Sequence, residues 1–149
     1  MTLGFSEKHP DGTPTEFRER ILMPLFPQIG EYRPDLKPKL HTFRVGTRWR
    51  KGMRIHMVYG NRTQRRTEFN KDIPELEYAK EVQECQICVD SGTGVSIIVD
   101  GRPLCRIETD EFIERDGFST REKFIKWFGK PGQTVLHTGQ LIQFSDFKY

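Results

Sequence analysis

Several features of common protein classes are missing from this sequence. No run of apolar residues approaches the roughly 18 that a membrane-spanning helix needs, so we expect no membrane partner. The first ten residues hold no basic segment followed by an apolar stretch, and we therefore expect no secretory signal. The three cysteines are an odd number, and a chain of this length does not depend on disulfides to fold. Together these absences predict a cytoplasmic protein.

Motifs for cofactors and metals are missing as well. The chain has no glycine-rich phosphate loop and no metalloprotease helix, so we expect no nicotinamide or flavin cofactor. A structural zinc site takes four ligands, whereas Cys85 and Cys88 form one isolated Cys-x-x-Cys pair. These two positions would also face opposite sides of a regular strand. We predict neither a metal nor a cofactor, and we interpret the cysteines as small buried hydrophobic residues.

The sequence does contain enough apolar material for one core. Of its 149 residues, 35% are hydrophobic, 11% are aromatic and 30% are charged, with both signs mixed. Such a composition predicts one globular domain over residues 1–149 rather than a disordered chain. Nothing in it fixes an oligomeric state, and a monomer is our expectation.

Charge is distributed unevenly along the chain. Residues 44–68 hold one acidic residue against eight basic ones, namely Arg44, Arg48, Arg50, Lys51, Arg54, Arg62, Arg65 and Arg66. Residues 72–84 reverse the sign, with five acidic residues against one lysine. A surface polarised in this way can steer a polyanion to one face of the protein. The alternative is an arginine-rich hairpin that is simply solvated.

The first third of the chain predicts a strand, a helix and a loop. Residues 3–5 predict a short strand, and Thr13 or Thr15 can cap a helix that ends at Met23. The glycine and prolines of residues 28–39 predict an irregular loop.

The remainder predicts an α+β fold. Alternating apolar residues or turn signals predict strands at 42–44, 54–59, 82–89, 95–99, 104–107, 135–136 and 141–144. Asp100-Gly101 is a favoured two-residue hairpin turn. Thr109 can cap a helix through Arg115, and Ser119 with Glu122 can cap a second helix through Phe128. This order predicts helices set against a mostly antiparallel barrel.

The segment from Lys37 to Arg44 carries the most informative chemistry. A lysine at 39, a hydroxyl at Thr42 and a guanidinium at Arg44 can reach one side of a barrel mouth. Lysine in such a place can bind phosphate, or it can act as a base if burial lowers its pKa. The alternative is an ordinary charged loop.

This segment resembles the signature of the ASCH family, Gly-x-Lys-x-x-x-x-Arg. Lys39 and Arg44 occupy the Lys and Arg positions, and Lys37 stands where the family usually has Gly. The segments Arg50–Ile55 and Asp116–Ser119 also resemble the family, so the resemblance covers roughly residues 37–149. It implies a PUA-like, mostly antiparallel β-barrel with short flanking helices.

The resemblance implies three functions, all of which involve Lys39. The first is binding of RNA or a modified nucleoside. The second is an amidohydrolase acting on an N4-acylated cytidine, for which the family uses a Lys, a Thr and a Glu. Lys39 and Thr42 match the first two, and Asp116 stands at the Glu position. The third is a ribonuclease that relies on Lys39.

Arginines interleaved with aromatic residues are typical of surfaces that neutralise phosphates and stack bases. We therefore predict a nucleic-acid surface formed by Arg44, Arg48, Trp49, Arg50, Arg62, Arg65 and Arg66. The alternative is that an aromatic residue of this block, Tyr59 above all, belongs to the core.

Overall fold

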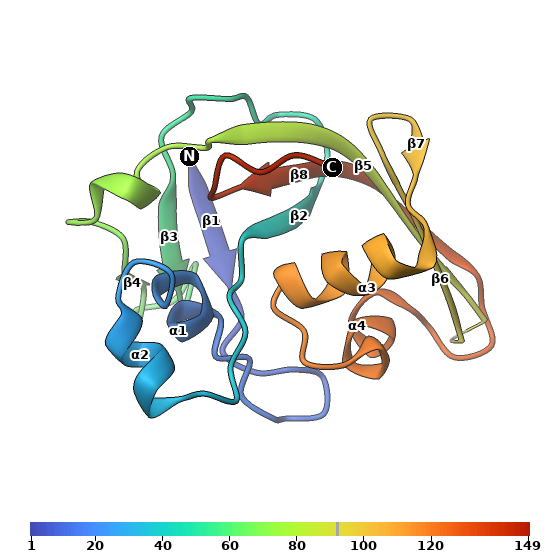
Figure 1. Cartoon of the computed structure of the whole chain (residues 1–149), viewed down its shortest axis with the longest axis horizontal. Helices are drawn as coiled ribbons and strands as arrows, with labels where there is room; N and C mark the ends of the chain where they lie inside the picture. The colour runs from blue at the N-terminus through green and yellow to red at the C-terminus, as the bar shows by residue number, and fades with distance from the viewer. Residues whose placement is uncertain (92) are drawn as a thin grey trace.

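Across residues 1–91 and 93–149, which the computed structural model describes, the chain forms two β-sheets (Figure 1). The larger sheet has the strand order β2-β8-β5-β6-β7, and all its neighbouring strands are antiparallel. These strands are β2 (His41–Val45), β5 (Glu81–Asp90), β6 (Gly94–Val99), β7 (Arg102–Pro103) and β8 (Val135–Gln143). Odd-numbered residues of β5 are buried, so one face of this sheet packs on the core, as the sequence alternation predicts.

The smaller sheet has the order β1-β3-β4. Its strands are β1 (Thr2–Phe5), β3 (His56–Tyr59) and β4 (Thr67–Glu68). The pair β3 and β4 is antiparallel, whereas β1 and β3 run parallel. The fold is therefore α+β with mostly antiparallel strands, as predicted.

The two sheets are joined on one side and open on the other. On the joined side, the Ile55 N–H donates to the Glu77 carbonyl (2.8 Å) and the Ala79 N–H donates to the Met53 carbonyl (3.0 Å). On the other side, within the described residues, β1 pairs with β3 alone and β2 with β8 alone. The predicted barrel is therefore wrong, because no backbone ladder connects β1 to β2. The Arg44 side chain bridges β2 and β1 instead, because its guanidinium donates to the Gly4 carbonyl.

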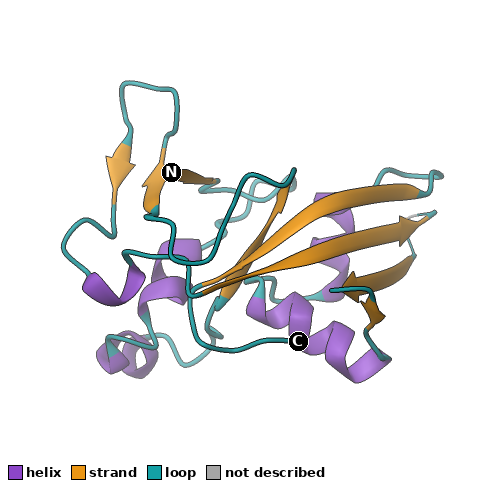
Figure 2. Ribbon diagram, turned by 90° about the horizontal axis from the view of Figure 1, so that it is seen from above, coloured by secondary structure: helices purple, strands orange, loops and turns teal. Residues whose placement is uncertain are grey.

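Helices cover both sheets on one side (Figures 1 and 2). Helices α1 (Phe17–Leu22) and α2 (Pro27–Tyr32) lie beside the smaller sheet, and the 3₁₀ helix η1 (Pro74–Leu76) leads toward β5. Helices α3 (Arg106–Arg115) and α4 (Arg121–Phe128) pack on each other and on β6 and β5. Among residues 1–91 and 93–149, none of the helices is long and apolar enough to span a bilayer.

The structure corrects two predictions in the first third of the chain. Helix α1 begins after Glu16, which has φ of 54° and makes no side-chain capping bond. Thr13 and Thr15 bond elsewhere, to the Asp11 carboxylate and the Ser6 carbonyl, and do not cap the helix. Helix α2 occupies residues that were expected to be a loop, because a proline at the first helical position already has a helical φ.

Helix α3 begins four residues earlier than predicted. Its N-cap is Cys105, whose N–H donates to the Glu108 carboxylate at 2.8 Å in a capping box, so Thr109 lies inside the helix. The expected strand at 104–107 is accordingly wrong, and β7 is limited to Arg102–Pro103. The turn at Asp100-Gly101 is confirmed, with φ of 49° and 78°.

The predictions for α4 and β8 need smaller changes. Thr120 caps α4 in place of Ser119, accepting the Lys123 N–H at 3.2 Å. The two short strands expected at 135–136 and 141–144 are one continuous strand, β8. Buried apolar side chains from both sheets and from the helices form one contiguous core.

Candidate functional site

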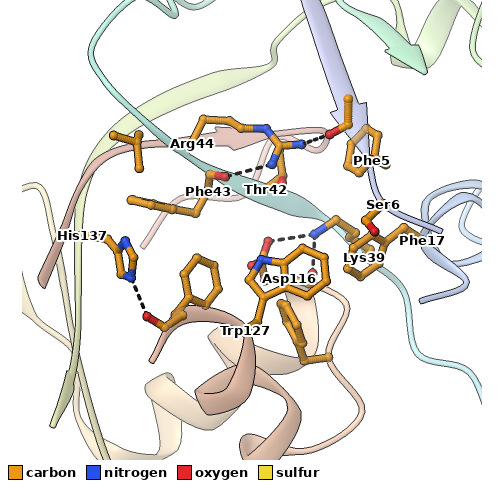
Figure 3. Close-up of a pocket in the computed structure, with 14 residues that line it drawn as sticks. Phe5, Ser6, Phe17, Lys39, Thr42, Phe43, Arg44, Asp116, Trp127 and His137 are labelled. Carbon is orange, nitrogen blue, oxygen red and sulfur yellow. Dashed lines mark hydrogen bonds and ion pairs between the residues drawn. The ribbon is translucent and has the colours of Figure 1, made fainter. Parts of the chain in front are cut away.

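A pocket of about 360 Å³ occupies the open side of the two sheets. It lies between the end of β1 and the edge strand β2, and residues of α4 and β8 also line it (Figure 3). Aromatic rings dominate the lining, namely Phe5, Phe17, Phe43, Phe118, Trp127 and Phe128. This volume and apolar lining fall within the range typical of small-molecule sites.

Lys39 and Asp116 meet inside this pocket. The Lys39 Nζ donates to the Asp116 Oδ1 at 2.8 Å and also to the Asp116 backbone carbonyl. Both residues are only 2% exposed, and the ammonium also lies 4.6 Å from the centre of the Phe17 ring. The two side chains come from segments 77 residues apart in the sequence. A buried ion pair with this geometry fixes both groups in one arrangement.

Gly117 makes room for this pair. It follows the last turn of α3 with φ of 92°, a conformation that favours glycine. A Cβ at this position would approach the Lys39 Cδ to 3.0 Å and the Phe17 ring to 3.1 Å. The predicted helix end at Asp116-Gly117 is therefore confirmed, and it also shapes the pocket.

Burial controls the electrostatics of the pair. Desolvation lowers the pKa of Lys39 from its usual 10.5 to about 8, although Asp116 opposes the change. For Asp116, burial alone would raise the pKa, but Lys39 and His41 outweigh it and the pKa is lowered. The carboxylate thus stays ionised, while the amine loses its proton within about one pH unit above neutrality. Such an amine can serve as a base.

Thr42 and Arg44 are two residues apart on β2, so their side chains share one face of the strand. Both line the pocket. The Arg44 guanidinium donates to the Gly4 carbonyl at 2.6 Å and to the Phe43 carbonyl at 3.4 Å, and it lies 5.3 Å from the centre of the Phe5 ring. Arg44 therefore links β2 to β1 where backbone pairing is missing. Burial lowers the pKa of Arg44, with Asp116 acting in the opposite direction.

His137 contributes a polar group from β8. Its Nε2 lies 2.6 Å from the Phe128 carbonyl, which can only accept, so this nitrogen carries the proton. In the neutral ring, Nδ1 is then an acceptor at the pocket wall. The pocket thus combines flat aromatic surfaces with donors and an acceptor at its edge.

Four of the predicted site residues line this one pocket: Lys39, Thr42, Arg44 and Asp116. The predicted nucleic-acid surface divides differently. Arg48, Arg50, Arg62, Arg65 and Arg66 are exposed and do not belong to the pocket lining. Trp49 is 2% exposed, with both backbone groups bonded to Gln140, so it is a core residue and cannot stack on a base.

Several pocket residues were missed because tertiary packing alone brings them there. Phe5, Trp127 and His137 come from β1, α4 and β8 and belong to no local motif with Lys39. Phe118 could have been found, because it directly follows the Asp116-Gly117 pair. Within the part of the chain that the structure describes, no group of three or more His, Cys, Asp and Glu side chains could hold a metal ion.

The fold and pocket define an α+β domain with a buried lysine–aspartate pair in an aromatic pocket. No protein-family model matches the chain, and searches of curated proteins and of solved structures returned no match either. The geometry of the site therefore carries the functional argument.

Proposed function

We propose that the protein binds RNA or a modified nucleoside and holds one base in the pocket of Lys39. The observation that carries this proposal is the aromatic lining of a roughly 360 Å³ pocket around a buried, ion-paired lysine. Flat rings bind the faces of a nucleobase, while Arg44, Thr42 and His137 can donate to or accept from its edge.

The ion pair favours a base rather than a phosphate inside the pocket. Lys39 and Asp116 have opposite charges at 2.8 Å, so the pair is close to neutral as a unit. A phosphate beside it would face the Asp116 carboxylate as well as the ammonium. The phosphates of a bound RNA would instead lie outside the pocket, where the exposed Arg62, Arg65 and Arg66 can neutralise them.

An amidohydrolase acting on an N4-acylated cytidine-type nucleoside is the second candidate. The specific observation in its favour is a lysine with a pKa of about 8 in the same pocket as the Thr42 hydroxyl. The neutral amine would take a proton from Thr42 or from water, and Arg44 could stabilise the oxyanion that forms. The C–N bond would then break, with Lys39 returning the proton to the departing amino group of the base. The acyl group would leave as a carboxylic acid, directly if water attacks or after water hydrolyses the ester if Thr42 attacks. A ribonuclease has no comparable support, since the neutral pair offers no cradle for a scissile phosphate.

We further propose that the fold is PUA-like and of the ASCH type, with an open side in place of a closed barrel. The meeting of Lys39, Arg44 and Asp116 in one pocket supports this proposal, because these are the positions of the family resemblance. The mostly antiparallel larger sheet with its short helices is also compatible with it.

The two tryptophans provide a direct binding experiment. Cytidine, N4-acetylcytidine and a mixed RNA pool would each be added to the isotope-labelled protein, and the indole N–H signals would be followed by NMR. We expect the signal of Trp127, which lines the pocket, to shift, while that of the buried Trp49 stays in place. An unchanged Trp127 signal with all three additions would refute the proposed binding.

Mass spectrometry of the same mixtures separates binding from hydrolysis. If the protein is an amidohydrolase, N4-acetylcytidine loses its acetyl group, and Thr42→Val abolishes the loss while the Trp127 shift persists. Intact N4-acetylcytidine together with a Trp127 shift would leave binding alone as the function. Fragments of the RNA pool that Lys39→Met abolishes would instead favour the ribonuclease.

A further inference from the structure

Asp116 has a second buried neighbour, His41, which does not belong to the pocket lining. His41 is fully buried, with its ring 4.7 Å from the centre of the Phe112 ring. Its Nε2 lies 2.9 Å from the Tyr149 hydroxyl, and its Nδ1 lies 3.6 Å from the Asp116 Oδ1. Tyr149, His41, Asp116 and Lys39 therefore form one continuous line of polar groups through the core.

The surroundings of His41 determine its tautomer. Burial lowers the pKa of His41, so the ring is neutral and carries one proton. Within the described residues, Nδ1 has no hydrogen-bond partner inside 3.5 Å, and the Asp116 carboxylate oxygen lies 3.6 Å from it. A lone pair on Nδ1 would face the lone pairs of that carboxylate, whereas an N–H would point toward a negative charge. The proton therefore resides on Nδ1, and Nε2 accepts from the Tyr149 hydroxyl.

We propose that His41 and Tyr149 are positioning residues of the pocket, with Tyr149 donating to His41 and His41 directing its Nδ1–H at Asp116. The arrangement resembles a catalytic triad in one respect: each group fixes the orientation of the next. His41 is not itself part of the pocket lining, and it acts only through Asp116. The proposal stands on the contacts themselves, and only its effect on turnover rests on the proposed function.

Other charged groups face this line. Arg115 lies 5.9 Å from the centre of the Tyr149 ring and pairs with Glu111 at 3.3 Å. Asp100 is held by Gln83, whose Oε1 also accepts the Tyr149 N–H. On the Lys39 side, Arg20 and Arg44 both oppose a positive charge. Burial raises the pKa of Tyr149, so its hydroxyl stays protonated and able to donate throughout the neutral range.

The support from His41 matters most when Lys39 is neutral. While Lys39 is charged, its ammonium stabilises the Asp116 carboxylate. Once Lys39 loses its proton, the buried carboxylate no longer faces a positive charge. The Nδ1–H of His41 then contributes more to stabilising it. Removing that donor destabilises the state with neutral Lys39 more than the ion-paired state. The pKa of Lys39 should therefore rise when the line is interrupted.

The test is an NMR titration of the Lys39 side chain in the full chain, which needs no ligand. For Tyr149→Phe, which removes one hydroxyl, we expect the midpoint to rise by about half a pH unit. For His41→Leu we expect a rise of about one unit, and His41→Asn should restore part of it because an amide N–H replaces Nδ1–H. Tyr59→Phe is the matched control, since the Tyr59 hydroxyl accepts from the Arg18 N–H and lies outside this line.

The outcomes separate the two proposals. A Lys39 midpoint that is the same in Tyr149→Phe as in the wild type, with an intact fold, would mean that Tyr149 only packs and would overturn the inference. A raised midpoint in a protein that binds no nucleoside would support the positioning roles and reject the proposed function. If N4-acetylcytidine is hydrolysed, the pH–rate profile of Tyr149→Phe should shift to higher pH by the same amount as the Lys39 titration midpoint.

Discussion

The basic residues of this chain occupy two opposite environments, one buried and one exposed. Lys39 is buried against a carboxylate at 2.8 Å, whereas Arg62, Arg65 and Arg66 extend from an exposed loop between β3 and β4. Burying a charge costs several kcal/mol and is tolerated only with a well-placed partner, while a solvated arginine costs almost nothing. The buried lysine is therefore the more informative position, although the arginine block is the more conspicuous one in the sequence.

Removing the partner of the buried charge should have the largest effect. Asp116→Ala leaves the Lys39 ammonium in the core without its carboxylate, and we expect a loss of about 4 kcal/mol in the free energy of unfolding. Urea denaturation measures this loss. Glu122→Ala is the control, because Glu122 and its partner Lys126 are both exposed and the expected loss is under about 1 kcal/mol. Equal losses in the two variants would remove the distinction between the buried and exposed charges.

Trp49 tests whether an aromatic residue within the arginine block belongs to the core or to the exposed surface. Because it is a core residue, Trp49→Ala should lower the free energy of unfolding by about 3 kcal/mol. Affinity for RNA, measured under conditions where the variant is folded, should not change. A variant of native stability with weakened RNA binding would return Trp49 to the surface site.

The pH dependence of stability should reveal the lowered pKa of Lys39. Between the folded value of about 8 and the unfolded value of 10.5, the unfolded chain binds more protons at this site. This contribution to stability is therefore complete above 10.5 and is lost as the pH falls through 8, a change of roughly 3 kcal/mol.

Other groups titrate in the same window, so the measurement is a difference. Burial raises the pKa of Cys85 and Tyr149, and their contributions are present at low pH and decline as the pH rises. Subtracting the urea-unfolding profile of Lys39→Met from that of the wild type cancels them. A flat difference between pH 8 and 10.5 would show that Lys39 titrates alike in the folded and unfolded chains.

The exposed arginines should have the smallest effect on stability and a measurable effect on RNA binding. Changing Arg62, Arg65 and Arg66 together to Gln should alter the free energy of unfolding by less than about 0.5 kcal/mol. The same change should reduce the slope of log affinity against log salt by about 2, because three phosphate contacts are lost. The control changes three exposed cations elsewhere, Arg106, Lys126 and Lys130, to Gln. An equal reduction in the control would mean that the arginine loop has no special part in binding.

The sequence predicted features that depend on local signals better than features that depend on tertiary packing. Strands such as β5 and β6 were predictable because alternation and the Asp-Gly turn are local signals. The proximity of Lys39, Thr42 and Arg44 was also local. Their meeting with Asp116 followed from the family resemblance and not from spacing, since 77 residues separate Lys39 from Asp116.

The errors have physical reasons as well. Interleaving with arginines did not reveal that Trp49 faces inward, because the side of an irregular segment depends on what packs against it. Tyr149 and Trp127 reach the site through the docking of whole elements, for which the sequence has no short-range signal. The closed barrel was wrong because strand patterns do not specify whether the last pair of edges meets.

Gly117 has a consequence for how this domain can vary. One missing methyl group both ends a helix and sets the depth at which the lysine can lie, so the two properties cannot be changed independently. Any larger residue there would meet the Lys39 stem and the Phe17 ring at about 3 Å and would also strain the backbone. A substitution at Gly117 would thus change the end of α3 and the shape of the pocket at the same time.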